Sequence, residues 1–105
     1  MELSKNYLSV YYIGLNDQDT HTQKYNFGTY LKILNNILLE DDVTSYTITK
    51  VKGVYKGEFE TTIRLELLND CLTQKAIDNI KEVFNQECIM DITLPLYKSE
   101  MGLFR

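Results

Sequence analysis

The only histidine of the chain lies beside two carboxylates in the segment DQDTH, from Asp17 to His21. Carboxylates and imidazole both bind divalent cations and both carry protons in acid–base catalysis, so this segment is a candidate for either chemistry. A calcium loop of the EF-hand type needs a glycine at its sixth position and a glutamate at its twelfth, where this segment has Thr22 and Gly28. Because the ligand set is incomplete, we predict a solvated turn held by Asx hydrogen bonds and no metal site.

A second group of charged side chains falls on one face of a predicted strand. Glu60, Arg64 and Glu66 alternate with apolar residues, so they point to the same side. An acid–base cluster, an ion-paired solvated face and a binding surface are all compatible with this spacing. We predict a surface that binds a ligand or a protein partner, because Arg64, Lys50 and Lys52 are available as donors for phosphate or carboxylate. The predicted binding residues are Arg64, Glu60, Glu66, Tyr11, Tyr12, Lys50 and Lys52.

The sequence contains no recognisable nucleophile with its base. The serines lie in no elbow motif, one histidine is poor support for a Cys–His pair, and there is no glycine-rich phosphate loop. An enzyme would therefore have to depend on the Asp17, Asp19 and His21 segment. We predict a non-enzymatic binding protein without a cofactor.

Six elements position these residues. Aromatic and β-branched residues predict a strand over 7–15, and Asn26 is suited to cap a helix that ends at Glu40. Two further strands, over 44–55 and 59–67, flank the turn Lys56-Gly57. A second helix is capped by Asn69 or Thr73, and a last strand runs over 88–94 and stops at Pro95.

This order, βαββαβ, predicts an α+β ferredoxin-like fold in which two helices cover one face of a four-stranded antiparallel sheet. The apolar side of the third strand should lie under the helices. The parity of the first strand is left open, because it carries apolar residues on both faces. The open face is expected to hold Glu60, Thr62, Arg64, Glu66, Asp91 and Thr93, together with either Tyr7, Ser9, Tyr11 and Ile13 or Leu8, Val10 and Tyr12.

Length and composition limit the alternatives. The chain has 105 residues, of which 44% are apolar and 25% charged, as expected for one globular domain over residues 1–105. Its formal charge of −4 argues against binding to duplex DNA or to a membrane surface. The N-terminus lacks the apolar core of a signal peptide, and we expect Cys71 and Cys88 to be reduced and buried.

RNA binding is an alternative that the fold suggests, because RNA-recognition modules have this architecture and stack bases on aromatic side chains. Residues 12–16 (YIGLN) and the pair Lys56-Gly57 are similar to parts of the two sub-motifs of such modules. Glu58, Glu60 and Thr62 stand where outward aromatic residues are required, and acidic groups repel phosphate. These departures make RNA binding a secondary alternative, together with a metal-dependent enzyme.

The runs YIGLNDQDT and GVYKGEFETTI resemble a group of small uncharacterised proteins of bacteriophages and mobile elements. The resemblance covers residues 12–67 and supplies no residue roles. It implies a cytoplasmic protein of the bacterial host cell that counteracts host defence, by sequestering a small nucleotide-like signal or, alternatively, by occluding a host protein. We also predict self-association, as a dimer or higher oligomer, through the uncovered sheet face. The apolar tail after Leu96, with Met101, Leu103 and Phe104, docks on its own domain or on a neighbouring subunit.

Overall fold

The computed structural model describes residues 3–97, and the side chains of residues 6–96. Its elements are β1 (Leu3–Gly14), α1 (Phe27–Glu40), β2 (Thr47–Tyr55), β3 (Glu58–Leu68), α2 (Gln74–Val83) and β4 (Met90–Tyr97). The predicted tail lies outside the described residues, apart from its first residue in β4.

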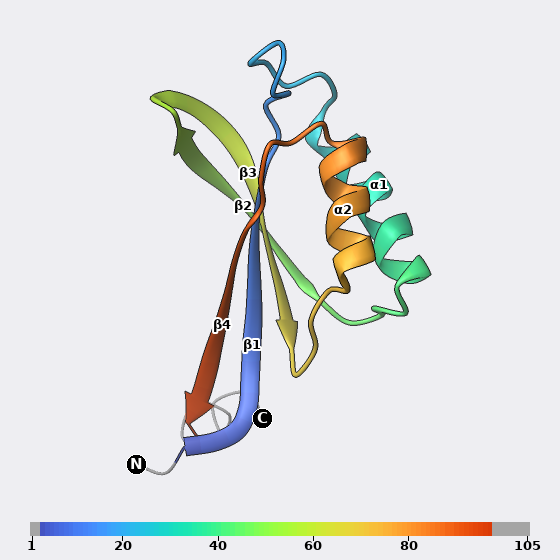
Figure 1. Ribbon diagram of the computed structural model, residues 1–105, viewed down its shortest axis with the longest axis vertical. Coiled ribbons are helices and arrows are strands. Elements are labelled where there is room, and N and C mark those ends of the chain that lie inside the picture. Colours follow the sequence, from blue (N-terminus) through green and yellow to red (C-terminus); the bar gives the residue numbers. More distant parts are fainter. Residues whose placement is uncertain (1–2, 98–105) are drawn as a thin grey trace.

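The four strands form one antiparallel sheet in the order β2-β3-β1-β4, and both helices lie against the same face of it (Figure 1). This confirms the predicted α+β ferredoxin-like architecture. The long β1 and β4 extend beyond the helices at one end of the sheet, and the hairpin of β2 and β3 curves away from the helices at the other (Figure 1). Among the described residues, no helix covers the second face of the sheet, which we call the open face (Figure 1).

Both helices begin at side-chain caps that the sequence predicted. The Asn26 Oδ1 atom accepts a hydrogen bond from the Thr29 N–H at 2.9 Å, and Thr73 Oγ1 accepts one from the Ala76 N–H at 3.1 Å. Each cap satisfies a backbone donor that has no partner inside the helix. Of the two caps considered for α2, Thr73 is therefore the one used.

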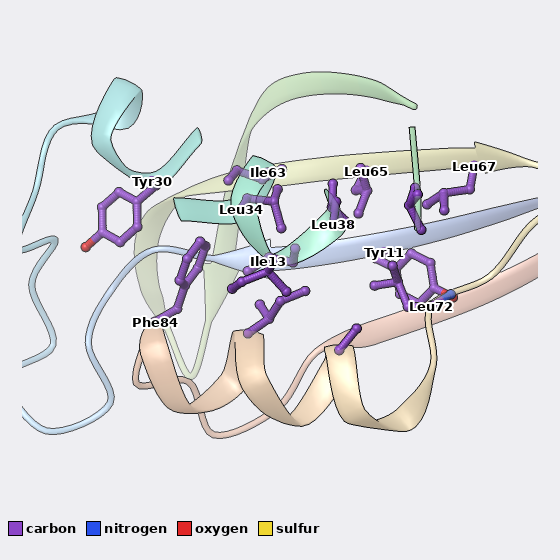
Figure 2. Close-up of a cluster of buried hydrophobic side chains, with 14 of the residues drawn as sticks. Tyr11, Ile13, Tyr30, Leu34, Leu38, Ile63, Leu65, Leu67, Leu72 and Phe84 are labelled. Atoms are coloured by element: carbon purple, nitrogen blue, oxygen red, sulfur yellow. The ribbon is translucent and has the colours of Figure 1, made fainter. Parts of the chain in front are cut away.

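The core lies between the helices and one face of the sheet (Figure 2). Ile63, Leu65 and Leu67 of β3 are fully buried, which confirms the predicted parity of this strand. Tyr11 and Ile13 of β1 belong to the same cluster. Tyr12, the residue between them, consequently faces the open side together with Arg64, the β3 residue with which it pairs.

The prediction that Tyr11 lies on a binding surface is wrong. Its ring is 4% exposed, and its hydroxyl accepts a hydrogen bond from the Leu72 N–H at 2.9 Å. Burial raises the pKa of this hydroxyl, because an apolar environment disfavours the phenolate. Tyr11 therefore holds the chain between β3 and α2 and has a structural role.

The faces of β4 are the reverse of those predicted. Asp91 and Thr93 pair with Tyr11 and Ser9, on the helix side of the sheet, whereas Ile92 and Leu94 lie on the open face, each 40% exposed. The reversal is possible because β4 is an edge strand at which the helices bury little. Pro95 also does not end the strand, since an edge strand tolerates a residue without an N–H donor.

Two smaller expectations concern the cysteines and membranes. Cys71 and Cys88 are free, as predicted, but both are exposed rather than buried. Among residues 3–97, the helices are too short or too polar to cross a membrane.

Candidate functional site

A cleft of about 590 Å³ lies at the end of the open face where β1 ends and β4 begins. This volume is within the usual range for small-molecule sites, roughly 300–1,000 Å³. Three segments that are distant in the sequence enclose it: the β2–β3 hairpin, the loop after β1, and the segment before β4.

The hairpin projects over the cleft because its turn has two residues with positive φ. Lys56 (φ 50°) and Gly57 (φ 81°) connect the paired residues Tyr55 and Glu58. Two consecutive positive φ angles define the type I′ turn, whose twist matches that of the flanking strands. The hairpin therefore brings Tyr55, Lys56 and Glu58 to the rim of the cleft.

Glu60 has the most specific setting of the acidic residues in the cleft. Its carboxylate lies directly over Gly14 of β1, where a Cβ atom would come within 2.5 Å of Glu60 Oε2. Glu60 Oε2 also accepts a hydrogen bond from the Asn16 N–H at 3.1 Å. No cation pairs with this half-buried carboxylate within the described part of the chain, so its negative charge remains available to a ligand.

Arg64 lies two positions beyond Thr62 on the same face of β3. Its Nη2 atom is 3.3 Å from Glu66 Oε2, and its Cζ atom is 5.8 Å from the centroid of the Tyr12 ring. Its Nε atom is buried and has no hydrogen-bond partner among the described residues. Arg64 thus has donor capacity left over at the cleft.

Tyr55, Lys56 and Glu87 form a hydrogen-bonded group at the rim. Tyr55 donates to Glu87 Oε2 at 2.8 Å, and Lys56 Nζ lies 3.0 Å from the same oxygen. Lys56 in the first place, and Tyr55 in the second, lower the pKa of Glu87, whereas the carboxylate raises the pKa of Tyr55. This group ties the hairpin to the segment before β4 and fixes the width of the cleft.

The Asp17 segment forms the third wall. Asp17 accepts hydrogen bonds from the Asp19 and Thr20 N–H groups at 2.8 and 3.1 Å, which is the predicted Asx turn. The turn is not solvated as expected, because Asp17 is only 3% exposed and also contacts Asn85 and Lys24. Asn85 and then Lys24 hold the pKa of Asp17 well below its usual range.

The His21 side chain contacts a different partner from the side chains of Asp17 and Asp19. Its Nδ1 atom lies 3.2 Å from Glu58 Oε1 across the cleft entrance, so it joins the loop to the hairpin. Within residues 3–97, no group of three or more histidine, cysteine, aspartate or glutamate side chains is arranged to hold a metal ion.

The predicted binding residues are only partly brought together. Tyr12, Glu60 and Arg64 line the cleft, whereas Glu66 lies outside its lining and only forms an ion pair with Arg64. Lys52 lies at the rim, with its Nζ atom 5.2 Å from the centroid of the Phe59 ring.

Lys50 is elsewhere. It pairs with the core residue Ile63, and its Nζ atom lies 5.1 Å from the centroid of the Phe27 ring at the start of α1. Lys50 therefore belongs to the helix side of the sheet and contributes no charge to the cleft.

Sequence reasoning missed Gly14, Asn16, Tyr55 and Glu87. Only Gly14 carried a usable signal, because a glycine inside a strand often marks the close approach of another group. The other three depend on which loops meet in space.

Two solved structures share this fold. A phage SAM lyase in complex with S-methyl-5'-thioadenosine aligns with a TM-score of 0.65 and 17% sequence identity, over 90% of this chain and 85% of that chain. A phage SAM lyase in the apo state aligns with the same TM-score and 16% identity, over the same shares. No protein-family model matches the sequence, and no curated protein matches it.

The comparison corrects one prediction and supports another. The expectation of a non-enzymatic protein is contradicted, because the structures that share the fold are those of a lyase. The resemblance to phage proteins is supported in its coarse form, since these neighbours are phage proteins, although no shared motif identifies the family.

Proposed function

We propose that the protein is an enzyme that cleaves S-adenosylmethionine and releases S-methyl-5'-thioadenosine, and that the cleft on the open face is its active site. The observation that carries the proposal is the Glu60 carboxylate, which is seated over Gly14 without a cation partner among the described residues. The shared fold with a phage SAM lyase supports it.

The substrate is a sulfonium ion, and the reaction removes its charge. The carboxylate of the methionyl chain attacks Cγ as the bond between sulfur and Cγ breaks, so the four-carbon fragment leaves as a lactone. The electron pair of the broken bond goes to sulfur, which becomes a neutral thioether. A carboxylate close to the sulfonium attracts the substrate and not the product. Glu60 would therefore favour substrate binding and product release, and it needs no proton transfer for this role.

The remaining walls suit the nucleoside. Val51, Tyr55 and Met90 give the cleft an apolar side, and Met90 is 58% exposed. Purine rings bind to such surfaces by stacking and apolar contact. The parity of β4 matters here, because it places Met90 beside Tyr12.

The expected biological role is retained in part. A small nucleotide-like host metabolite remains the ligand class, but degradation replaces sequestration. We propose that this occurs in the cytoplasm of an infected bacterium, as a means of counteracting host defence.

Self-association remains part of the proposal. Leu68 on β3 and Ile92 and Leu94 on β4 lie on the open face and are 49%, 40% and 40% exposed. A contiguous apolar area on a sheet face is a typical interface between copies of a chain.

The test is incubation of the purified protein with S-adenosylmethionine, followed by chromatographic quantification of S-methyl-5'-thioadenosine. We expect product formation by the wild type and a higher KM for Glu60→Gln, with a smaller change in kcat. Lys50→Gln, which removes a charge on the helix side of the sheet, is the matched control. The absence of turnover by a folded wild type would overturn the proposal.

A further inference from the structure

Arg64 has an unused donor in a cleft that also holds the Glu60 carboxylate, which no cation pairs with among the described residues. We infer that Arg64 binds the α-carboxylate of the substrate and thereby makes the cleft selective for sulfonium compounds that carry an amino-acid part. The inference rests on the proposed function and deepens it, because it assigns the part of the substrate that the Glu60 carboxylate does not contact.

The hydrogen bonding of Arg64 is incomplete. A guanidinium has five N–H donors and binds carboxylates best through two parallel hydrogen bonds. The contact to Glu66 uses Nη2 at 3.3 Å, which is long for a charge-assisted hydrogen bond. The buried Nε atom has no partner within the described chain, and an unsatisfied buried donor is costly. The Nη groups that Glu66 leaves free can donate to a carboxylate in the cleft, and a guanidinium that turns toward this ligand would also bring Nε to an acceptor.

The orientation of the side chain is fixed from one side. The guanidinium lies against the Tyr12 ring, with Cζ 5.8 Å from the ring centroid, and only 35% of the Arg64 side chain is exposed. An aromatic face under a guanidinium leaves its edge free for a planar anion. Arg64 is thus held ready for a ligand instead of moving freely in solvent.

The spacing of the two charges fits one ligand. Glu60 lies over Gly14, and Arg64 lies over Tyr12, two residues earlier on the same face of β1. Two residues along a strand span about 7 Å, so the two charged groups are near neighbours. In the substrate, three carbon atoms separate the sulfonium from the carboxylate. Thr62, between Glu60 and Arg64 on β3, is small enough to leave this path open.

Three probes separate the contributions of the sulfonium and of the carboxylate to binding. S-adenosylmethionine has both charges, its decarboxylated analogue keeps the sulfonium and loses the carboxylate, and S-methyl-5'-thioadenosine lacks both. For the wild type, Arg64→Gln, Arg64→Lys and the control Lys50→Gln, affinity is measured at one ionic strength, as the KM for S-adenosylmethionine, which is consumed, and as inhibition constants for the other two probes. Melting temperatures establish that each variant is folded.

We expect the wild type and Lys50→Gln to bind S-adenosylmethionine about tenfold to a hundredfold more tightly than its decarboxylated analogue, as a charge-assisted contact implies. Arg64→Gln should lose this preference while its affinity for S-methyl-5'-thioadenosine changes by less than about twofold. Arg64→Lys should recover only part of the preference, because an ammonium group does not form the paired hydrogen bonds.

The outcomes are distinguishable. A preference that survives in folded Arg64→Gln, or an equal loss of affinity for all three probes, would overturn the inference alone. If the wild type binds none of the probes, the proposed function fails and the inference fails with it.

Discussion

Gly14→Ala is the sharpest test of the site, because it changes the position of Glu60 without changing any charged residue. The added Cβ would lie 2.5 Å from Glu60 Oε2 and from Glu60 Cδ, well inside van der Waals contact. The backbone of β1 is held at Gly14 by its pairing with Thr62 of β3, and β4 pairs with β1 as far as Tyr12, so the side chain of Glu60 must move. We expect the carboxylate to swing into solvent and to lose its hydrogen bond to the Asn16 N–H.

The stability of the protein should change little. Alanine in a strand is favoured over glycine by roughly 0.5–1 kcal/mol, and the loss of one hydrogen bond costs about 0.5–1.5 kcal/mol. The two effects nearly cancel, so the free energy of unfolding should stay within about 1 kcal/mol of the wild type.

Ligand affinity should fall much more. The attraction between a sulfonium and a carboxylate in such a cleft lies between about 1 kcal/mol for an exposed pair and about 4 kcal/mol for a close pair near a protein surface. Affinity for S-adenosylmethionine should therefore fall by about fivefold or more. Urea unfolding measures the free energy of unfolding, and the KM for S-adenosylmethionine, determined on the same preparation, measures the affinity.

A double-mutant cycle shows whether the effect passes through Glu60. In the Glu60→Ala background the added methyl group of Gly14→Ala meets no carboxylate, so the second substitution should not reduce affinity further. Gly28→Ala is the control, because its Cβ would meet Asn26 Oδ1 at an ordinary 3.5 Å. Unchanged affinity in Gly14→Ala, or additive losses in the cycle, would refute the assignment of Glu60 to the ligand.

Three further predictions concern other parts of the molecule. Tyr11→Phe leaves the buried Leu72 N–H without its acceptor and should lower the free energy of unfolding by about 1–3 kcal/mol, with unchanged ligand affinity in the cleft. The lowered pKa of Asp17 means that its stabilising effect is complete above the unfolded-state pKa of about 3.9 and is lost as the pH falls below it. Thermal melts between about pH 5 and 3 should thus depend less on pH in Asp17→Asn than in the wild type or in the exposed control Asp78→Asn. Ile92→Glu places a charge on the apolar part of the open face and should abolish self-association in sedimentation; a wild type that is monomeric at high concentration would contradict that prediction.

The extent to which the sequence predicted the fold differs from strand to strand. In β3 the two faces differ sharply in polarity, and the prediction of a buried side with Ile63 was confirmed. In β1 both faces carry apolar residues, because one packs on the helices and the other lies in the middle of the open face. Only the structure decides that Tyr11 is buried and that Tyr12 lines the cleft.

In β4 the alternation of apolar and polar residues is visible in the sequence, but the sequence does not show which set faces the helices. We expect the apolar residues of a strand to face the core, and this expectation holds where helices cover the sheet. At the edge strand, Asp91 is exposed on the helix side and Ile92 lies on the open face. The same displacement toward the edge explains why Pro95 is tolerated within the strand.

The charged residues of β3 show which contacts can be predicted from residue spacing along one strand. Arg64 and Glu66 are two residues apart on one face, about 7 Å along the strand, so their ion pair follows from the sequence and is present. Glu60 and Arg64 are four residues apart, about 13 Å along the strand, which is too far for the same kind of contact. An ion-paired face therefore accounts for Glu66 and leaves Glu60 without a cation. The sequence alone does not show how β1 pairs with β3. In the structure the Glu60 carboxylate lies over Gly14 of β1, toward the position where Tyr12 pairs with Arg64. The separation of opposite charges that suits a dipolar ligand thus arises from the pairing of β1 with β3, and neither strand possesses it alone.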